Sequence, residues 1–293
     1  MIKMRYKHIV FNGTIRVEER EALPIRRNEV LGKTLSIYIG FLESLIVNGL
    51  IPVSPPKILG SYAVLRILED QSNEPNYSGR LVITYPYGEK GFLGIHIDGV
   101  LGTYVSLPRT YIYGEVNDKN PYNTLIPLID HCNYLAEKAE GSTLIVGCNI
   151  YSFTTFYAYT FIHNTYPDLY CPVKNIFRKI KLKPLRNLSE LKSSYDTIIL
   201  TSPKHSIIDN VLRKSMFKQL IISKFSFSKY IPLNHLGEFH VIHTHQTSKN
   251  PALREKVMKT LKKVIRVVEI DDIEKIMSYF SRIGLGVIVK FSA

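Results

Sequence analysis

The second half of the chain alternates between strand-like and helix-like segments, and this pattern constrains the fold more than any other feature. Short apolar runs rich in Ile, Val and Thr are separated by longer segments with helical periodicity. Such alternation predicts a parallel sheet with helices on both of its faces. The predicted strands are 143–147, 169–173, 197–201, 219–223 and 238–243, and the predicted helices are 125–136, 152–163, 206–214, 251–263 and 271–282.

The first part of the chain has a different pattern, in which apolar and polar residues alternate with period two. Asn12 and Gly13 form the tight turn of a predicted hairpin, and Gly49 is a favourable residue for ending a helix. The predicted elements here are strands at 6–11, 14–18, 29–38, 62–69 and 80–85 and a short helix at 41–48. We therefore expect an all-β, partly closed barrel, followed by a domain boundary at 117–122.

Composition limits the classes of function. The 293 residues suit two domains, and the formal net charge of +13 predicts attraction to anions such as nucleotides or nucleic acids. The alternative, which we favour, is a lysine-rich surface typical of a thermophile. No apolar run reaches the roughly 18 residues that cross a bilayer, and no signal peptide is recognised. We expect a cytoplasmic protein without a membrane partner.

The three cysteines, Cys132, Cys148 and Cys171, are widely spaced, and none belongs to a CxxC pair. Their spacing predicts neither a disulfide framework nor a structural zinc lobe.

The turn after the strand 143–147 is the candidate nucleotide site. Dinucleotide-binding folds place three glycines in this turn, so that the backbone passes close to the pyrophosphate. Here the first is Gly147, Asn149 stands at the second and Ser152 at the third. Asn can adopt a positive φ, so the turn can survive, although the Asn149 side chain crowds a pyrophosphate. The candidate contacts are Gly147, Asn149, Ile150 and Ser152, with the helix N-terminus offering N–H groups to an anion.

The end of the second predicted strand lacks the acidic residue that accepts the ribose hydroxyls of NAD. Lys174 and Arg178 follow it instead, with Lys179 and Lys181 close behind. If a cofactor binds, these cations favour the 2′-phosphate of NADP(H), held by Lys174 and Arg178. The alternative interpretation, which we favour, is a solvated basic helix.

Three further segments carry a resemblance to a known family. They are the proline-rich loop 49–60, the segment 98–108 that begins Asp-Gly-Val-Leu-Gly, and the final segment 284–291. In this order they resemble the zinc-type medium-chain alcohol and polyol dehydrogenases. The resemblance implies an α/β protein with a GroES-like β-barrel domain at 1–118, to which 284–293 return. It also implies a Rossmann-type, doubly wound parallel sheet at 119–283, shortened because 174–194 have room for one short crossover.

The resemblance also indicates where zinc ligands would stand, and they are missing. Gly40, Ser61 and Tyr62 occupy the positions of the expected cysteine, histidine and glutamate, and Ile126 that of a further glutamate. Glu43 matches an acidic residue that hydrogen-bonds around the site. Since zinc needs a set of thiolate, imidazole and carboxylate ligands, we predict no catalytic zinc and no other bound metal.

Two weaker groups of residues complete the candidates. A cluster of histidines could bind a metal, but we favour an ordinary role for them as strand residues. A group of tyrosines with one lysine could stack on a ligand, but we favour packing and surface roles for it. The histidines are His235, His240, His243 and His245, and the second group is Tyr85, Tyr87, Lys90, Tyr111 and Tyr113.

These observations predict a degenerate medium-chain dehydrogenase-like protein without catalytic or structural zinc. It would act as a binding or interaction protein or persist as a relic oxidoreductase, with a nucleotide or another anion as its ligand. One alternative is a zinc-independent NADP(H)-dependent oxidoreductase of the quinone, enone or carbonyl reductase type. Another is a basic protein associated with nucleic acid or ribonucleoprotein. Whether the chain is an enzyme stays open, and the resemblance implies a homo-oligomer.

Overall fold

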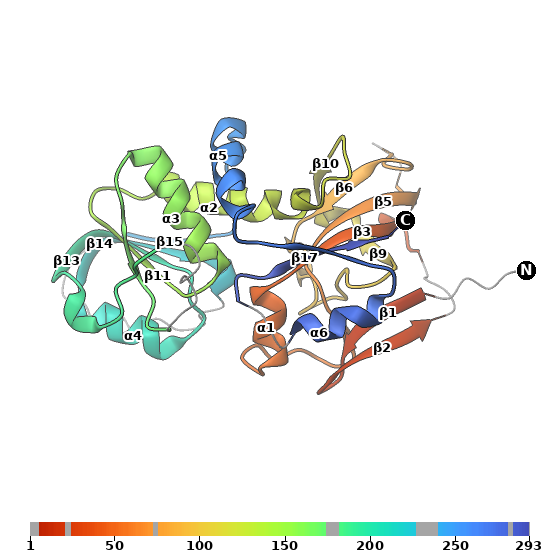
Figure 1. The fold of residues 1–293 in the computed structure, drawn as a ribbon, viewed down its shortest axis with the longest axis horizontal. Helices are drawn as coiled ribbons and strands as arrows, with labels where there is room; N and C mark the ends of the chain where they lie inside the picture. The colour runs from red at the N-terminus through yellow and green to blue at the C-terminus, as the bar shows by residue number, and fades with distance from the viewer. Residues whose placement is uncertain are drawn as a thin grey trace, which may run out of the picture. The chain divides into compact units, whose positions relative to one another are not determined.

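The computed structural model describes residues 6–20, 25–72, 76–173, 182–226, 240–280 and 284–292 (Figure 1). The chain divides into two compact units, Met1–Pro127 with Ile265–Ala293, and Leu128–Val264. We expected divisions at 118 and 284. The short helix η2 (Pro121–Leu125) packs against strands of the first unit, and the residues from Ile265 onward add two strands to that unit's sheet. No helix among the described residues is long and apolar enough to span a membrane.

A seven-stranded mixed sheet forms the centre of the first unit. Its order is β10-β6-β5-β3-β17-β16, and β9 also pairs with β3. In β3, buried and half-buried residues alternate before the strand becomes fully buried, as period-two patterning predicts. The strands are β3 (Glu29–Ile39), β5 (Tyr62–Asp70), β6 (Leu81–Thr84), β9 (Tyr104–Pro108), β10 (Ile112–Glu115), β16 (Val267–Ile270) and β17 (Val287–Phe291).

Smaller elements complete this unit. The predicted hairpin at the start of the chain is present, with Gly13 at a positive φ in its turn. It consists of β1 (Tyr6–Phe11) and β2 (Ile15–Arg20), and β4 (Lys57–Ile58) pairs with β1. The remaining elements are β7 (Tyr87–Gly88), β8 (Gly91–Phe92), α1 (Phe41–Val47), α6 (Met277–Phe280), η1 (Arg109–Tyr111) and η6 (Ile273–Ile276).

The second unit is built on a five-stranded, fully parallel sheet in the order β12-β11-β13-β14-β15. Apolar residues of α4 join a buried core with one face of this sheet, and Figure 1 shows α3 and α5 on the other face. The strands are β11 (Thr143–Val146), β12 (Asp168–Tyr170), β13 (Ser194–Leu200), β14 (Met216–Ser223) and β15 (His240–Thr244). The helices are α2 (Ile126–Glu137), α3 (Ile150–His163), α4 (His205–Lys214) and α5 (Pro251–Leu261), with the short η4 (Leu188–Glu190) and η5 (Lys224–Ser226). The predicted α/β class and doubly wound sheet are confirmed.

One residue continues the sheet beyond β12. The Leu185 N–H donates to the Leu169 carbonyl at 2.8 Å, and the Leu185 carbonyl accepts the Cys171 N–H at 3.0 Å. Leu185 thus forms a single parallel bridge with Tyr170. Among residues 182–226, this bridge is the only pairing at that edge of the sheet.

Candidate functional site

The turn from β11 to α3 lies at the carboxyl edge of the parallel sheet. The neighbours of β11 are β12 on one side and β13 on the other, so the strand order reverses direction here. Ligands of open α/β sheets bind outside the carboxyl ends of strands at such a switch point. The Gly147 N–H donates to the Tyr170 carbonyl at 3.1 Å, and a Cβ on Gly147 would collide with the Thr201 hydroxyl. This glycine therefore allows the close approach of β13.

Asn149 is the N-cap residue of α3. Its Oδ1 atom accepts the N–H groups of Tyr151 at 2.9 Å and Ser152 at 3.1 Å, and its Nδ2 donates to the Thr201 carbonyl at 2.7 Å. The Ser152 hydroxyl oxygen lies 3.0 Å from the Asn149 nitrogen, which completes a capping box. The backbone of Asn149 is extended, so the turn forms without the positive φ that Asn can adopt.

Capping changes what the helix N-terminus offers to a ligand. The N–H groups of Tyr151 and Ser152 are bound by Asn149, and the Phe153 N–H donates to the Asn149 carbonyl at 3.1 Å. Asn149, Ile150 and Ser152 are all buried. The structure thus brings the predicted turn residues together, but it directs their polar groups toward one another and toward Thr201.

A disulfide joins Cys148 in this turn to Cys171, directly after β12, with a Cα–Cα distance of 5.0 Å. The cysteine spacing did not predict this single disulfide. The two cysteines are 23 positions apart in the sequence, but they follow two neighbouring parallel strands whose ends meet. Cys132 is unpaired and buried, and burial raises the pKa of its thiol to about 12.

An aromatic cluster fills the same edge beside β14. The ring of Tyr151 stacks on Phe225, with centroids 5.2 Å apart, and the His131 imidazole contacts Phe225 edge-on at 4.7 Å. The His131 ring nitrogens lie 2.8 Å from the Gln246 carbonyl and 2.8 Å from the Ser223 hydroxyl. Burial lowers the pKa of His131 to about 4, so the imidazole is neutral at pH 7. Tyr151, Phe225 and His131 are all buried, which makes the cluster a packed interior.

The predicted 2′-phosphate ligands, Lys174 and Arg178, lie outside the described residues, as does His235. His240 and His243 lie on β15, and His245 follows it; burial lowers the pKa values of His243 and His245. Within the described ranges, no group of three His, Cys, Asp or Glu side chains is arranged to hold a metal ion.

The expected zinc position lies in the first unit, and its residues do not fit the metal. The ring of Tyr38 occupies the space that a side chain on Gly40 would need, and its hydroxyl donates to the Leu285 carbonyl at 2.6 Å. The Glu43 carboxylate accepts the Gly40 N–H at 2.9 Å, and burial raises its pKa. The Ser61 hydroxyl donates to the Leu93 carbonyl at 3.1 Å.

Neighbouring residues add no replacement ligand. Tyr62 is buried, and its ring meets Tyr38 edge-on at 6.2 Å, while Ile126 begins α2. Neither thiolate nor imidazole is present among the matched positions, and zinc requires such donors.

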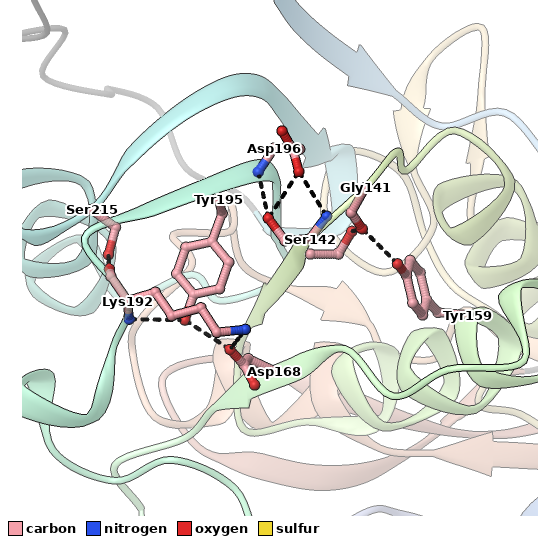
Figure 2. A network of polar contacts seen from close by, with 9 residues as sticks. Gly141, Ser142, Tyr159, Asp168, Lys192, Tyr195, Asp196 and Ser215 are labelled. Carbon is pink, nitrogen blue, oxygen red and sulfur yellow. Dashed lines mark hydrogen bonds and ion pairs between the residues drawn. The ribbon is translucent and has the colours of Figure 1, made fainter.

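A polar network ties together the amino ends of the strands, at the opposite edge of the parallel sheet (Figure 2). The Asp168 carboxylate accepts the Tyr195 hydroxyl at 3.0 Å and lies 3.0 Å from the Lys192 ammonium. The Asp196 carboxylate accepts the backbone N–H and the hydroxyl of Ser142, both at 2.9 Å.

Lys218 donates to the other Asp196 oxygen at 2.7 Å, and together with Ser142 it lowers the pKa of Asp196 to about 2. A cavity of about 500 Å³ adjoins this network, lined by Tyr159, His163 and Tyr166 among others. Sequence reasoning did not identify the network. Its charged groups are paired with one another, which indicates a role in joining the strands.

Comparisons with known proteins show likeness at the level of structure. No family model and no curated protein matches the sequence. A putative zinc-binding dehydrogenase from Sinorhizobium meliloti 1021, solved bound to NADP, matches with a TM-score of 0.67 at 15% identity, over 98% of this chain and 99% of that chain. An oxidoreductase/dehydrogenase of unknown specificity involved in membrane biogenesis, from Escherichia coli, matches with a TM-score of 0.71 at 14% identity. The match covers 99% of this chain and 100% of that chain.

Glucose dehydrogenase from Haloferax mediterranei, in complex with NADP, Zn and gluconolactone, matches with a TM-score of 0.70 at 13% identity, over 99% of this chain and 100% of that chain. Butanediol dehydrogenase from Bacillus subtilis is also similar, with a TM-score of 0.66 at 14% identity, over 97% of this chain and 99% of that chain. The chain therefore has the fold of the zinc-type medium-chain alcohol and polyol dehydrogenases, with its GroES-like and Rossmann-type organisation.

Proposed function

We propose that this chain keeps the medium-chain dehydrogenase fold as a binding protein and no longer uses it for zinc-dependent alcohol oxidation. The observation that carries the proposal is the capped turn, in which Asn149 takes the N–H groups of α3 that a pyrophosphate would use. A second, independent change supports it in the other unit, where the Tyr38 ring fills the space of a ligand at position 40.

The side chains at the expected zinc position are unsuited to hold the metal. A catalytic zinc is held by three protein ligands and polarises the alcohol oxygen in the fourth position. Gly40 has no side chain, and the Ser61 hydroxyl donates to the Leu93 carbonyl. The Glu43 carboxylate accepts the Gly40 N–H as part of the cap of α1. A carboxylate committed to backbone N–H groups cannot hold zinc alone.

Space and hydrogen-bond donors for a nucleotide are both restricted at the turn from β11 to α3. A pyrophosphate at the turn would compete with Asn149 for the Tyr151 and Ser152 N–H groups. It would also lie close to the disulfide between Cys148 and Cys171, which links the turn to the end of β12. In dinucleotide folds that strand end carries the ribose contact.

The alternative is a zinc-independent, NADP(H)-dependent reductase. It is favoured by the similar structures that were solved with NADP, and by the charge of +13. Hydride transfer to an activated alkene depends mainly on the positioning of cofactor and substrate, so the lack of zinc ligands does not oppose it. Lys174 and Arg178 would then hold the 2′-phosphate.

Metal analysis and NADPH titration of the purified protein distinguish the two. For a binding protein we expect substoichiometric zinc by mass spectrometry and no change in NADPH fluorescence at micromolar concentrations. Micromolar NADPH binding that is lost in Lys174→Glu and kept in Arg213→Glu, on the exposed face of α4, would establish the reductase instead. One zinc per chain would reject both.

A further inference from the structure

His8 is a buried histidine whose ring nitrogens both lack a hydrogen-bond partner within the described part of the chain. It lies on β1, and its ring packs directly against Gly102, with which His8 forms an isolated bridge. Buried polar side chains in folded proteins are generally hydrogen-bonded, and an unpaired one is costly. His8 also lines a cavity of about 260 Å³ in the first unit. Both ring nitrogens have almost no exposed surface, so the imidazole borders the cavity as part of its wall.

Three cations from separate elements surround this cavity. Arg20 ends β2, Arg26 precedes β3, and Lys90 lies in the turn between β7 and β8. Arg26 and Lys90 are exposed, and among the described residues neither side chain forms an ion pair. Arg20 contacts Glu18 at 3.5 Å. The cavity therefore has a cationic rim above the buried His8.

The two carboxylates of the cavity are already engaged. Glu29 accepts the Arg26 backbone N–H at 3.0 Å and the Ser106 hydroxyl at 3.1 Å. Asp98 accepts the Ile58 N–H at 3.1 Å. These bonds hold the loops in place, and Arg26 and Lys90 are the two rim cations whose side chains form no ion pair among the described residues.

Burial and the charge of Arg20 lower the pKa of His8 to about 4, against the opposing effects of Asp98 and Glu18. At pH 7 the imidazole is neutral, with one N–H donor and one acceptor nitrogen. The imidazole therefore adds no positive charge to the cavity.

We propose that this cavity of the first unit binds a small organic anion that carries a phosphate or a pair of carboxylates. Guanidinium groups recognise both oxyanions through paired N–H donors, and Lys90 adds a point charge. The volume lies just below the range of ordinary small-molecule pockets, which favours a small anion over a dinucleotide. The proposal does not depend on the fate of the zinc and nucleotide positions, because every residue of this cavity lies elsewhere.

Calorimetric titration with inorganic phosphate and, separately, with succinate tests it, at pH 7.5 and constant ionic strength set with sodium chloride. We expect saturable binding at one site per chain, weakened roughly tenfold or more in Arg26→Gln and in Lys90→Gln, since each removes a charge-assisted bond. Arg213→Gln, which removes one positive charge from the second unit, should bind like the parent protein. A response to phosphate alone identifies a phosphate ligand, and a response to succinate alone a dicarboxylate.

Nitrogen NMR of histidine-labelled protein provides a readout at His8 itself. We expect its ring signals, assigned by their loss in His8→Phe, to shift on titration and to remain unshifted in Arg26→Gln at the same concentration. Absence of saturable binding of both anions, or binding that Arg26→Gln and Lys90→Gln leave unchanged, overturns the proposal. NADPH binding that depends on Lys174 but not on Arg26 would reject the binding-protein function and leave this site intact.

Discussion

Asn149 and Ser152 hold each other in place at the start of α3: Asn149 Oδ1 accepts the Ser152 N–H at 3.1 Å, and Ser152 Oγ lies 3.0 Å from the Asn149 nitrogen. Both residues stand where dinucleotide-binding turns carry glycine. Glycine leaves the N–H groups of the helix open to a phosphate, whereas this pair uses them internally. In this chain the turn is therefore self-capped.

Asn149→Ala tests the strength of this cap. The substitution removes the acceptor for two N–H groups and the donor to the buried Thr201 carbonyl. We expect the free energy of unfolding to fall by about 2 kcal/mol or more, from loss of the cap and an unpaired carbonyl. Urea denaturation followed by circular dichroism measures it.

Asn250→Ala is the matched control, because Asn250 caps α5 through a single bond to the Leu253 N–H at 3.1 Å. We expect a smaller loss there, of about 1 kcal/mol. Equal losses in the two variants would mean that the bond to Thr201 contributes nothing.

The strands of the second unit were predictable because their short, continuous apolar runs are typical of buried parallel strands. Residues Thr143–Val146 are buried throughout, as a central parallel strand requires. In contrast, β16 was missed, because Val267–Ile270 is short and only its last residue is buried. The two-residue strands β7 and β8 carry too little pattern to be recognised at all.

The sequence predicts the turn after β11 as a candidate site, but the contacts that the turn makes were only partly predictable. The spacing of Asn149 and Ser152 is that of a capping pair, and this signal was available. The pairing of Cys148 with Cys171 depends on which strands become neighbours, which spacing alone does not reveal. The packing of Tyr38 against Gly40 likewise depends on the return of β17 beside β3, from the far end of the chain.

Thiol counting tests the link between Cys148 and Cys171. Without reductant, we expect alkylation under unfolding conditions to modify Cys132 alone, and with reductant to modify all three cysteines. In the folded protein Cys132 should resist modification, because it is buried and its pKa is raised to about 12. Mass spectrometry of the alkylated chain reads the count directly.

Cys148→Ser should lower the free energy of unfolding by about 3 kcal/mol under non-reducing conditions, since the bond closes a loop across 23 positions. In the presence of reductant, the variant and the parent protein should have similar stability. Three reactive thiols in the unreduced, unfolded parent protein would contradict the cross-link.

Gly40→Ala tests whether the Tyr38 ring excludes a side chain from the expected ligand position. Gly40 has a φ of −157°, outside the left-handed region that favours glycine, and a Cβ at this position would lie against the Tyr38 ring. We expect a loss of about 1–3 kcal/mol in the parent protein, as for overpacking of a core, and a much smaller loss in the Tyr38→Leu background. Urea denaturation of the parent protein, the two single variants and the double variant measures the coupling energy. Additive losses would show that the Tyr38 ring does not exclude a side chain at position 40.

The buried imidazole of His131 should make stability fall as the solution becomes acidic. Its pKa is about 4 in the folded protein and near the ordinary 6.5 in the unfolded chain. Between these values the unfolded chain binds more protons, so stability decreases with falling pH by up to about 1.4 kcal/mol per unit. His8, whose pKa is also lowered, likewise makes stability decrease with falling pH. Burial raises the pKa of Glu43, so this residue makes stability increase with falling pH.

Comparison of the parent protein with His131→Gln isolates the contribution of this residue, since glutamine keeps a donor and an acceptor for Ser223 and the Gln246 carbonyl. Unfolding free energies measured from pH 4.5 to 6.5 should show a shallower slope in the variant, whatever its absolute stability. Identical slopes would mean that His131 titrates normally in the folded protein, which a packed contact between its ring and Phe225 does not allow.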